Sequence, residues 1–214
     1  MERALEELRA MIFSGRLAAG SNHLEAELAS MLGMSRTPVR EALLMLEAQG
    51  LLEMKPRKGV RILSVSPEDM REIYDVLTEL ESLAAEQAAQ RGYGPDALAD
   101  LDRAIEEMEA AVSRDDLDRW AEADDRFHTE LVRLGQNRRI EMISNMMRDQ
   151  VRRARAITLF IRPKPAKSNE AHRRVYQAIA HGDADMARAA HRAHCQQARE
   201  MLVDLLERHR LRAL

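Results

Sequence analysis

The sequence has little cysteine, few aromatic residues and no long apolar run. Its single cysteine, Cys195, excludes an intrachain disulfide and is typical of proteins from a reducing compartment. Aromatic residues make up only 3% of the 214 residues, so leucine, alanine and 13 methionines must fill the cores, as in helical proteins. No segment is apolar over the roughly 20 residues that span a bilayer, and the charged N-terminus does not resemble a signal peptide. We therefore expect a cytoplasmic protein with no membrane partner.

The chain also lacks a large net charge. Its formal charge of −3 argues against a protein that coats nucleic acid regardless of sequence. The charge is unevenly distributed, because residues 34–63 hold 6 Lys and Arg against 3 Asp and Glu, whereas residues 64–214 hold 24 against 28. A local positive excess of this kind is typical of sequence-specific DNA binding.

Residues 28–46 predict two short helices around a tight corner. Gly33 allows the first helix to end, Ser35 can cap the second, and Pro38 falls in its first turn, where a missing N–H costs little. Apolar residues then repeat at helical spacing and should face inward: Val39, Leu43 and Leu46. Polar residues remain at the exposed start of the second helix, as in a helix that enters the major groove of DNA.

A basic hairpin is predicted directly after these helices. Residues 51–54 and 60–63 alternate like short strands, and Lys55-Pro56-Arg57-Lys58-Gly59 joins them. Such a hairpin is suited to the phosphate backbone or an adjacent minor groove, and a small helical domain with surface arginines is the plainer alternative. The residues expected at the DNA are Ser35, Arg36, Thr37, Arg40, Arg57, Lys58 and Gly59.

From about Ala4 to Leu63 the sequence resembles the N-terminal domain of GntR-type bacterial transcription regulators. The resemblance rests on Ile12, Gly15, Leu17, Gly20, Leu28-Ala29, Ser35 to Leu43, Leu46, Gly50-Leu51 and Gly59. It implies a winged helix-turn-helix in which Arg36, Thr37 and Arg40 contact operator bases and phosphates and Gly59 lies at the wing tip.

A second domain is predicted from Pro67 to residue 214, after a DNA-binding domain of residues 1–63 and a linker of residues 64–66. Helices are expected at residues 67–91, 95–113, 116–134, 138–160, 168–181 and 183–208, with breaks at residues 114–116, 135–137, 163–165 and 182–183. No second strand pattern occurs. The fold class is therefore mostly α, with an N-terminal winged helix-turn-helix and a C-terminal antiparallel bundle of about six helices.

One carboxylate and three histidines could converge inside this bundle. Asp124 and His128 lie one turn apart on one predicted helix. A hairpin turning at Gly182 would bring His194 back to the level of His172, because about ten residues lead out and eleven lead back. Three imidazoles and a carboxylate suit Zn²⁺, Ni²⁺, Mn²⁺ or Fe²⁺, although histidines on helices are more often solvated or satisfied locally.

A second resemblance favours the metal. The motif Asp124-x-x-Phe127-His128, with Asn137, His172 and His194, resembles the helical effector domain of the FadR-type GntR branch, and more narrowly its metal-binding subgroup. This resemblance implies that Asp124, His128, His172 and His194 hold a divalent metal, most simply zinc, with open positions for a small carboxylate. Leu77 stands where relatives often carry an arginine that reaches the effector, so arginines at 148, 152, 153 or 155 could supply that contact. The expected effector-binding residues are Arg148, Arg152 and His191.

These observations predict a ligand-responsive DNA-binding transcription regulator, a repressor acting as a homodimer, since a symmetric operator needs two recognition helices. Its partners would be double-stranded operator DNA and a small organic acid. Two alternatives remain: a regulator that senses the metal itself, and a metal-dependent hydrolase, for which no positioned base or nucleophile is evident.

Overall fold

A computed structural model describes residues 1–209, which divide into two compact units, residues 1–66 and 67–209. Residues 210–214, at the end of the predicted second domain, lie outside the described part.

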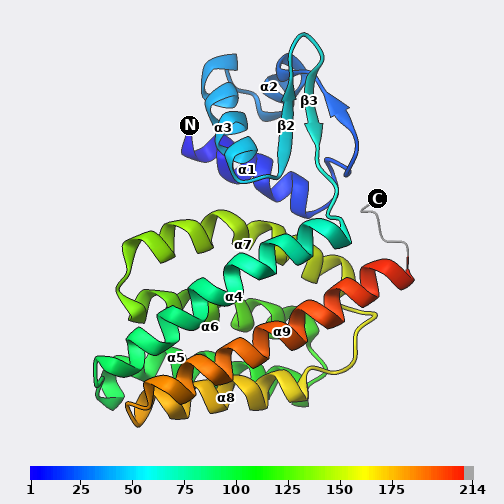
Figure 1. Cartoon of the computed structure of the whole chain (residues 1–214). Coiled ribbons are helices and arrows are strands. Elements are labelled where there is room, and N and C mark those ends of the chain that lie inside the picture. Colours follow the sequence, from blue (N-terminus) through cyan, green and yellow to red (C-terminus); the bar gives the residue numbers. More distant parts are fainter. Residues whose placement is uncertain (210–214) are drawn as a thin grey trace. The chain divides into compact units, whose positions relative to one another are not determined.

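The N-terminal unit is a helix-turn-helix followed by a β-hairpin (Figure 1). Its elements are α1 (Glu2–Phe13), β1 (Asn22–His23), α2 (Glu25–Leu32), α3 (Arg36–Ala48), β2 (Leu52–Lys55) and β3 (Gly59–Ile62). The strands form an antiparallel sheet in the order β1-β3-β2. The winged helix-turn-helix expected from the sequence is confirmed, with β1 as an additional strand that is too short to show an alternating pattern.

The corner between α2 and α3 forms as the sequence predicts, apart from one cap. Gly33 ends α2 in the left-handed conformation, with a φ of 61°. Ser35 occupies the N-cap position of α3 with an extended backbone, but its side chain accepts no capping hydrogen bond, so the expected cap is wrong. The inner face of α3 is completely buried, and α3 is held by packing: Val39, Ala42, Leu43 and Leu46.

Gly59 is required by the close approach of two strands. It pairs with Lys55 as the first residue of β3, so the wing tip is formed by residues 56–58, and the implied position of Gly59 at the tip is corrected by one residue. Its φ is +87°, and a Cβ atom would lie 2.2 Å from the carbonyl oxygen of His23 in β1. Only glycine combines this backbone conformation with that contact.

The C-terminal unit consists of six helices among the described residues, which confirms the predicted bundle. They are α4 (Pro67–Gln90), α5 (Pro95–Ser113), α6 (Leu117–Gly135), α7 (Arg138–Thr158), α8 (Ala166–Ala180) and α9 (Ala184–Arg208). Three helix starts are capped by side chains that accept backbone N–H bonds: Asp116, Asn137 and Asp183. No helix among residues 1–209 is long and apolar enough to cross a membrane.

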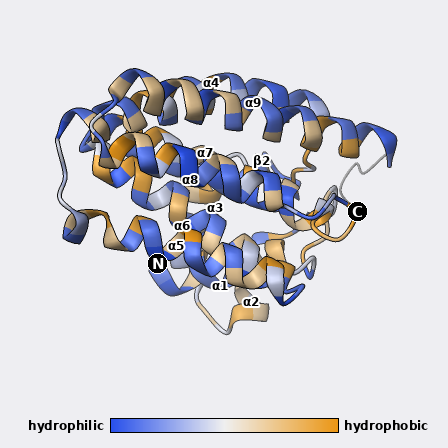
Figure 2. Cartoon of the chain, turned by 90° about the horizontal axis from the view of Figure 1, so that it is seen from below, coloured by the Kyte–Doolittle hydropathy of each residue, from blue (hydrophilic) through white to orange (hydrophobic). Residues whose placement is uncertain are grey.

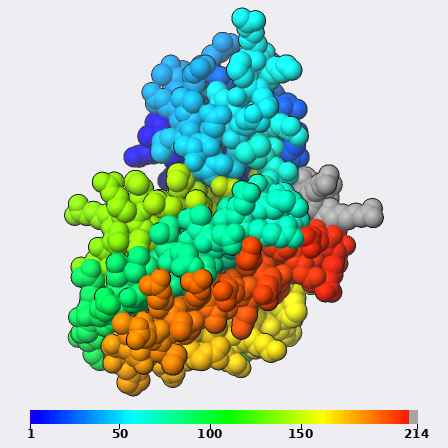
Figure 3. Space-filling model, viewed as in Figure 1, coloured from blue at the N-terminus to red at the C-terminus, as the bar shows by residue number. Residues whose placement is uncertain are grey.

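Helices α4 and α9 run side by side along the unit, and the hairpin of α8 and α9 turns at Gly182 (Figure 1). Hydrophilic and hydrophobic residues alternate around the helices, so that each helix buries one stripe (Figure 2). Side chains of α4 and α9 close over one face of the unit (Figure 3). Polar residues that are buried among these apolar faces are therefore candidates for a functional site.

Candidate metal and effector site, and candidate DNA-binding face

Three histidines from three helices meet inside the bundle. His128 comes from α6, His172 from α8 and His194 from α9, and each is at least 95% buried. The ring centroids of His172 and His194 lie 4.3 Å apart, and that of His128 lies 5.4 Å and 5.5 Å from them. One ring nitrogen from each lies within 4.8 Å of the others, a spacing that a single ion can bridge after small side-chain movements.

These imidazoles have ring nitrogens without hydrogen bonds. No partner among the described residues bonds the Nε2 atoms of His128, His172 and His194, or Nδ1 of His172. Burial lowers the pKa of His172 and of His194 well below the ordinary value, so both rings are neutral near pH 7. Neutral imidazoles with free lone pairs are the form that binds a metal, whereas unpartnered polar atoms in a core are otherwise costly.

Asp124 lies beside this group but has a second attachment. Its Oδ1 atom lies 3.5 Å from Nε2 of His172, and its Oδ2 atom lies 4.0 Å from Nε2 of His128. The same carboxylate accepts a hydrogen bond from Arg155 on α7. Burial would raise the pKa of Asp124, but Arg155 and the other neighbouring groups together outweigh it, and the pKa is lowered. Asp124 is therefore an ionised carboxylate at the edge of the histidine group.

A residue that was not expected, Glu81 on α4, orients His128. Its Oε2 atom lies 3.0 Å from Nδ1 of His128, and both side chains are buried. Burial would raise the pKa of Glu81, but His128 and other neighbours lower it to about 2. A carboxylate on Nδ1 holds the proton there and leaves Nε2 free as a metal ligand. The signal available in the sequence was an acidic residue within the apolar stripe of this helix, one turn after Leu77.

His191 contacts Glu81 and does not line the cavity beside the α7 arginines. Its Nδ1 atom is 3.2 Å from the hydroxyl of Ser82, and its Nε2 atom is 3.6 Å from Glu81. With Cys195 it forms a second buried group of possible ligand atoms around Glu81. His191 is thus not among the residues that line this cavity, and its contact with an effector stays a prediction.

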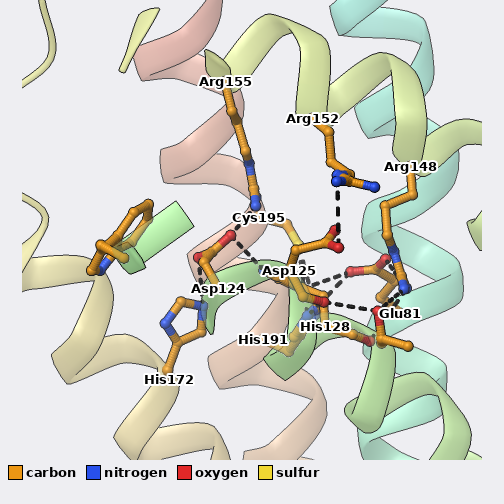
Figure 4. Close-up of polar contacts among 12 residues, drawn as sticks. Glu81, Asp124, Asp125, His128, Arg148, Arg152, Arg155, His172, His191 and Cys195 are labelled. Atoms are coloured by element: carbon orange, nitrogen blue, oxygen red, sulfur yellow. Dashed lines mark hydrogen bonds and ion pairs between the residues drawn. The ribbon is translucent and has the colours of Figure 1, made fainter. Parts of the chain in front are cut away.

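Arginines of α7 reach the carboxylates of this site (Figure 4). Arg148 lies 3.6 Å from Glu81 and donates to the carbonyl oxygen of His128, and Arg152 pairs with Asp125 at 3.7 Å. With Arg155 they line a cavity of about 20 Å³. Its other lining residues are Tyr74, Leu77, Glu81, Asp125, His128, Val151, His194, Cys195 and Ala198. The volume is about that of one water molecule, so a larger occupant requires side chains to move.

The donor set fits a divalent metal. Three neutral imidazoles and a carboxylate are the ligand types that first-row divalent ions prefer, and the unpartnered Nε2 atoms are the ligand atoms such an ion requires. The chemistry available to the site is therefore coordination of an ion and pairing of an anion with guanidinium groups.

The N-terminal unit presents a separate, positively charged face. Ser35, Arg36, Thr37 and Arg40 are all exposed at the start of α3, as expected. Arg40 forms an ion pair of 3.2 Å with Glu25 of α2, although 62% of its side chain is exposed. Such a surface pair is weak, so a phosphate or a guanine edge can displace Glu25.

The wing adds further cations to this unit. Arg57 and Lys58 are exposed at its tip. Three residues outside the expected set, Asn22, Lys55 and Arg61, line a hollow together with Lys58. Asn22 and Arg61 are register partners on β1 and β3, a pairing that the sequence pattern did not reveal.

Comparisons with known proteins define the class that this fold and these sites represent. Residues 1–62 match the family of bacterial regulatory proteins of the gntR type, and residues 72–197 match the FCD domain. The chain belongs to the GntR family of DNA-binding transcription regulators and carries an FCD effector-binding domain. It is a regulator rather than an enzyme, so the hydrolase alternative is excluded.

Particular relatives agree with this class. The chain is 42% identical over 131 residues, 60% of its own length and 77% of the other's, to an uncharacterised HTH-type transcriptional regulator of Agrobacterium vitis. It is 30% identical to the gluconate operon transcriptional repressor of Bacillus subtilis, over 68% of this chain and 59% of that protein. The E. coli McbR/YncC structure matches with a TM-score of 0.76 and 24% identity, over 94% of this chain and 95% of that one.

Proposed function

We propose that this protein is a homodimeric transcriptional repressor whose operator affinity changes when a small carboxylate binds at a divalent metal in the helical unit. The observation that carries the proposal is the set of buried, unpartnered Nε2 atoms of His128, His172 and His194 beside Asp124. A role in the core alone does not account for three such atoms directed at one point.

His128, His172, His194 and Asp124 are the residues that would hold the ion, and zinc is the simplest choice for this ligand set, with nickel, manganese or iron also possible. When bound, the ion supplies a Lewis-acidic position for a carboxylate oxygen. Glu81 keeps His128 oriented for this role through the 3.0 Å contact with Nδ1.

The α7 arginines orient the acid. Arg148, Arg152 and Arg155 line the cavity next to His128 and His194, and their planar guanidinium groups match a carboxylate in two-point contacts. The carboxylates that they now contact are protein groups, which an incoming anion would partly replace. The relative from Bacillus subtilis that is named for the gluconate operon supports both repression and a sugar-acid type of signal.

The exposed start of α3 would enter the major groove, where Arg36, Thr37 and Arg40 read base edges, while Arg57 and Lys58 contact phosphates. Ser35, before α3, and Gly59, at the start of β3, would bring backbone close to the DNA. Two copies of the chain would occupy half-sites about 34 Å apart, which is the reason for proposing a homodimer. Such a protein acts on chromosomal DNA in the cytoplasm.

Helix α4 provides the covalent route between signal and DNA. It begins at Pro67, with four residues between it and the end of β3, and its residues Tyr74, Leu77 and Glu81 line the cavity. A carboxylate that moves these side chains therefore acts on the helix that continues directly from the wing. Coupling between two sites is typically about 1–3 kcal/mol, or 5- to 150-fold in affinity.

The test measures operator affinity by fluorescence anisotropy, with full-length protein and an operator selected from random double-stranded DNA. Gluconate, lactate, malate and citrate are titrated against the complex, first with zinc loaded and then after chelation. We expect at least one acid to change the operator Kd by about 5- to 150-fold, and only in the loaded protein.

The double variant His128→Ala and His172→Ala should lose both the metal and the response. His181→Ala, which changes an exposed histidine of the same unit, is the matched control and should retain them. Elemental analysis that finds no metal after reconstitution would overturn the metal site. Acids that bind while the operator Kd stays constant would overturn the coupling.

A second candidate function is sensing of the ion itself. The small cavity, about 20 Å³, favours it because a water molecule or an ion fits without rearrangement and an organic acid does not. Metal-dependent operator affinity that no organic acid changes would establish this function in place of the first.

A further inference from the structure

Arg162, between α7 and α8, is a half-buried cation that forms no ion pair with any residue in the described part of the chain. Its guanidinium group lies over the ring of Trp120, 4.6 Å from the centroid. Its Nε and Nη2 atoms are inaccessible and have no hydrogen-bond partner. Burial, reinforced by the charge of Arg155, lowers the pKa of Arg162 to about 10, so it remains charged at pH 7. Two inaccessible donor atoms of this kind are costly unless an acceptor reaches them, and an anion is the acceptor that suits a guanidinium group.

Arg162 lies at the same end of the bundle as the metal-site residues. Trp120 is one turn before Asp124 on α6, and its Nε1 atom donates to Asn169 at 2.8 Å. Asn169 is in turn three residues before His172 on α8. Arg162 is therefore placed about one helical turn from both Asp124 and His172.

Tyr74 of α4 provides a second unpartnered group. Its side chain is 3% exposed and lines the cavity between the histidines and the α7 arginines. Arg155 lies beside its hydroxyl group but can only donate, and no described residue accepts a hydrogen bond from that hydroxyl. Tyr74 and Arg162 are close enough for the tyrosine to influence the charge of the arginine. Two donors near Asp124 thus lack acceptors.

The charges of the site are not balanced by its own acids. Glu81 pairs with Arg148, and Asp124 pairs with Arg155, so these four groups neutralise one another. Arg162 remains, together with the two charges of a divalent ion. An acid with one carboxylate compensates only part of this excess, whereas an acid with two or three compensates most or all of it.

We propose that Arg162 and Tyr74 form a second anion subsite and that the effector is a di- or tricarboxylate, with one carboxylate at the metal and another on Arg162. This inference rests on the proposed function, since it assumes a carboxylate at the metal. It assigns a role to Arg162, which lies outside α7, and it narrows the effector from any small carboxylate to one with at least two carboxylates.

The experiment uses two acids that differ only in the second carboxylate. Malate and 2-hydroxybutyrate have the same carbon number and the same hydroxyl position, and a methyl group in the latter replaces a carboxylate of the former. Isothermal titration of the zinc-loaded full-length protein should show malate binding at least 10-fold more tightly. Citrate should bind at least as tightly as malate, and gluconate more weakly than malate.

Variants locate the preference at the proposed subsite. Arg162→Gln should reduce the ratio of the two affinities to below 3-fold, and Arg162→Lys should give an intermediate ratio because the charge remains without the planar fork. Tyr74→Phe should weaken malate binding by about 3- to 10-fold. Arg119→Gln removes the same charge from a side chain that is 76% exposed on the helix of Trp120 and should keep the ratio of the unaltered protein.

The outcomes distinguish a failure of the second anion subsite from a failure of the proposed function. Equal affinities for malate and 2-hydroxybutyrate in the unaltered protein, tighter binding of gluconate than of malate, or an unchanged ratio in metal-loaded Arg162→Gln would overturn the subsite and leave the proposed function standing. If no acid binds the metal-loaded protein, the proposed function fails as well. The comparison of acids in the unaltered protein keeps the test valid even if Arg162→Gln does not fold.

Discussion

At the scale of single residues, Glu81 and His128 show how a buried acid organises a group of ligands. The imidazole has two nitrogens, and the 3.0 Å contact at Nδ1 determines which of them is left to face His172 and His194. Arg148, 3.6 Å away, stabilises the carboxylate from the other side. Glu81 thus acts on the metal through His128 and is a positioning residue.

Replacing Glu81 should weaken metal binding without removing a ligand. Glu81→Gln keeps the shape but loses the charge that stabilises the Nδ1–H group, so the affinity for zinc should fall by about 10- to 100-fold. Competition with a chromogenic chelator measures this change. Glu79→Gln, on an exposed part of the same helix, should leave the affinity unchanged. A role confined to packing predicts lower thermal stability with the zinc affinity intact, and that result would remove Glu81 from the site.

At the scale of elements, α3 and the wing have different positions and different expected roles. The start of α3 exposes Arg36, Thr37 and Arg40 on a helix whose other face is completely buried, so its orientation is rigid. The wing exposes Arg57 and Lys58 on a two-strand hairpin. A rigid helix suits base readout, which needs exact donor positions, whereas phosphate contacts tolerate a hairpin.

Substitutions in the two elements should therefore have different effects on DNA binding. Arg40→Ala should cost about 1–3 kcal/mol of operator binding and relax discrimination at one base position. Lys58→Ala should weaken binding to all sequences alike and reduce the slope of log Kd against log salt by about one. Arg103→Ala, an exposed arginine of the helical unit, is the control. Footprinting and salt titrations in which neither variant differs from this control would show that the face is wrongly assigned.

At the scale of the whole molecule, the chain combines two units with separate cores. Leu8, Val39 and Leu43 belong to the core of the N-terminal unit, while Trp120 and Phe127 belong to that of the helical unit. A metal that joins α6, α8 and α9 would stabilise the helical unit alone, because a ligand stabilises only the folded structure that binds it. The effect of the metal on the stability of each unit can consequently be measured separately.

Zinc should raise the unfolding free energy of the helical unit by about 2.7 kcal/mol at a free concentration of 100 times its Kd. Fluorescence of Trp120, which is 98% buried, follows this unit during urea unfolding. Hydrogen exchange of residues 1–66 should be the same with and without zinc. If zinc also raises the unfolding free energy of the double variant His128→Ala and His172→Ala, the ion does not bind at the three histidines.

The sequence by itself determined the elements and their order. Helical periodicity, cap residues and breaking glycines are local signals, and they placed the six bundle helices within a few residues of the observed bounds. Gly182 also made the meeting of His172 and His194 predictable, because a hairpin with nearly equal arms has a defined register. The basic hairpin and the exposed polar start of α3 followed from equally local patterns.

Only the tertiary structure decided which side chains share the buried site. Glu81 from α4, Arg155 from α7 and Arg162 from the following segment lie far from one another in sequence, and the packing angles that bring them around Asp124 depend on the whole core. The same packing turned His191 toward Ser82 and away from the cavity, although it lies only three residues before His194. Periodicity assigns a residue to one face of a helix. Which residues of other helices it contacts depends on how the helices pack, and packing is a non-local property.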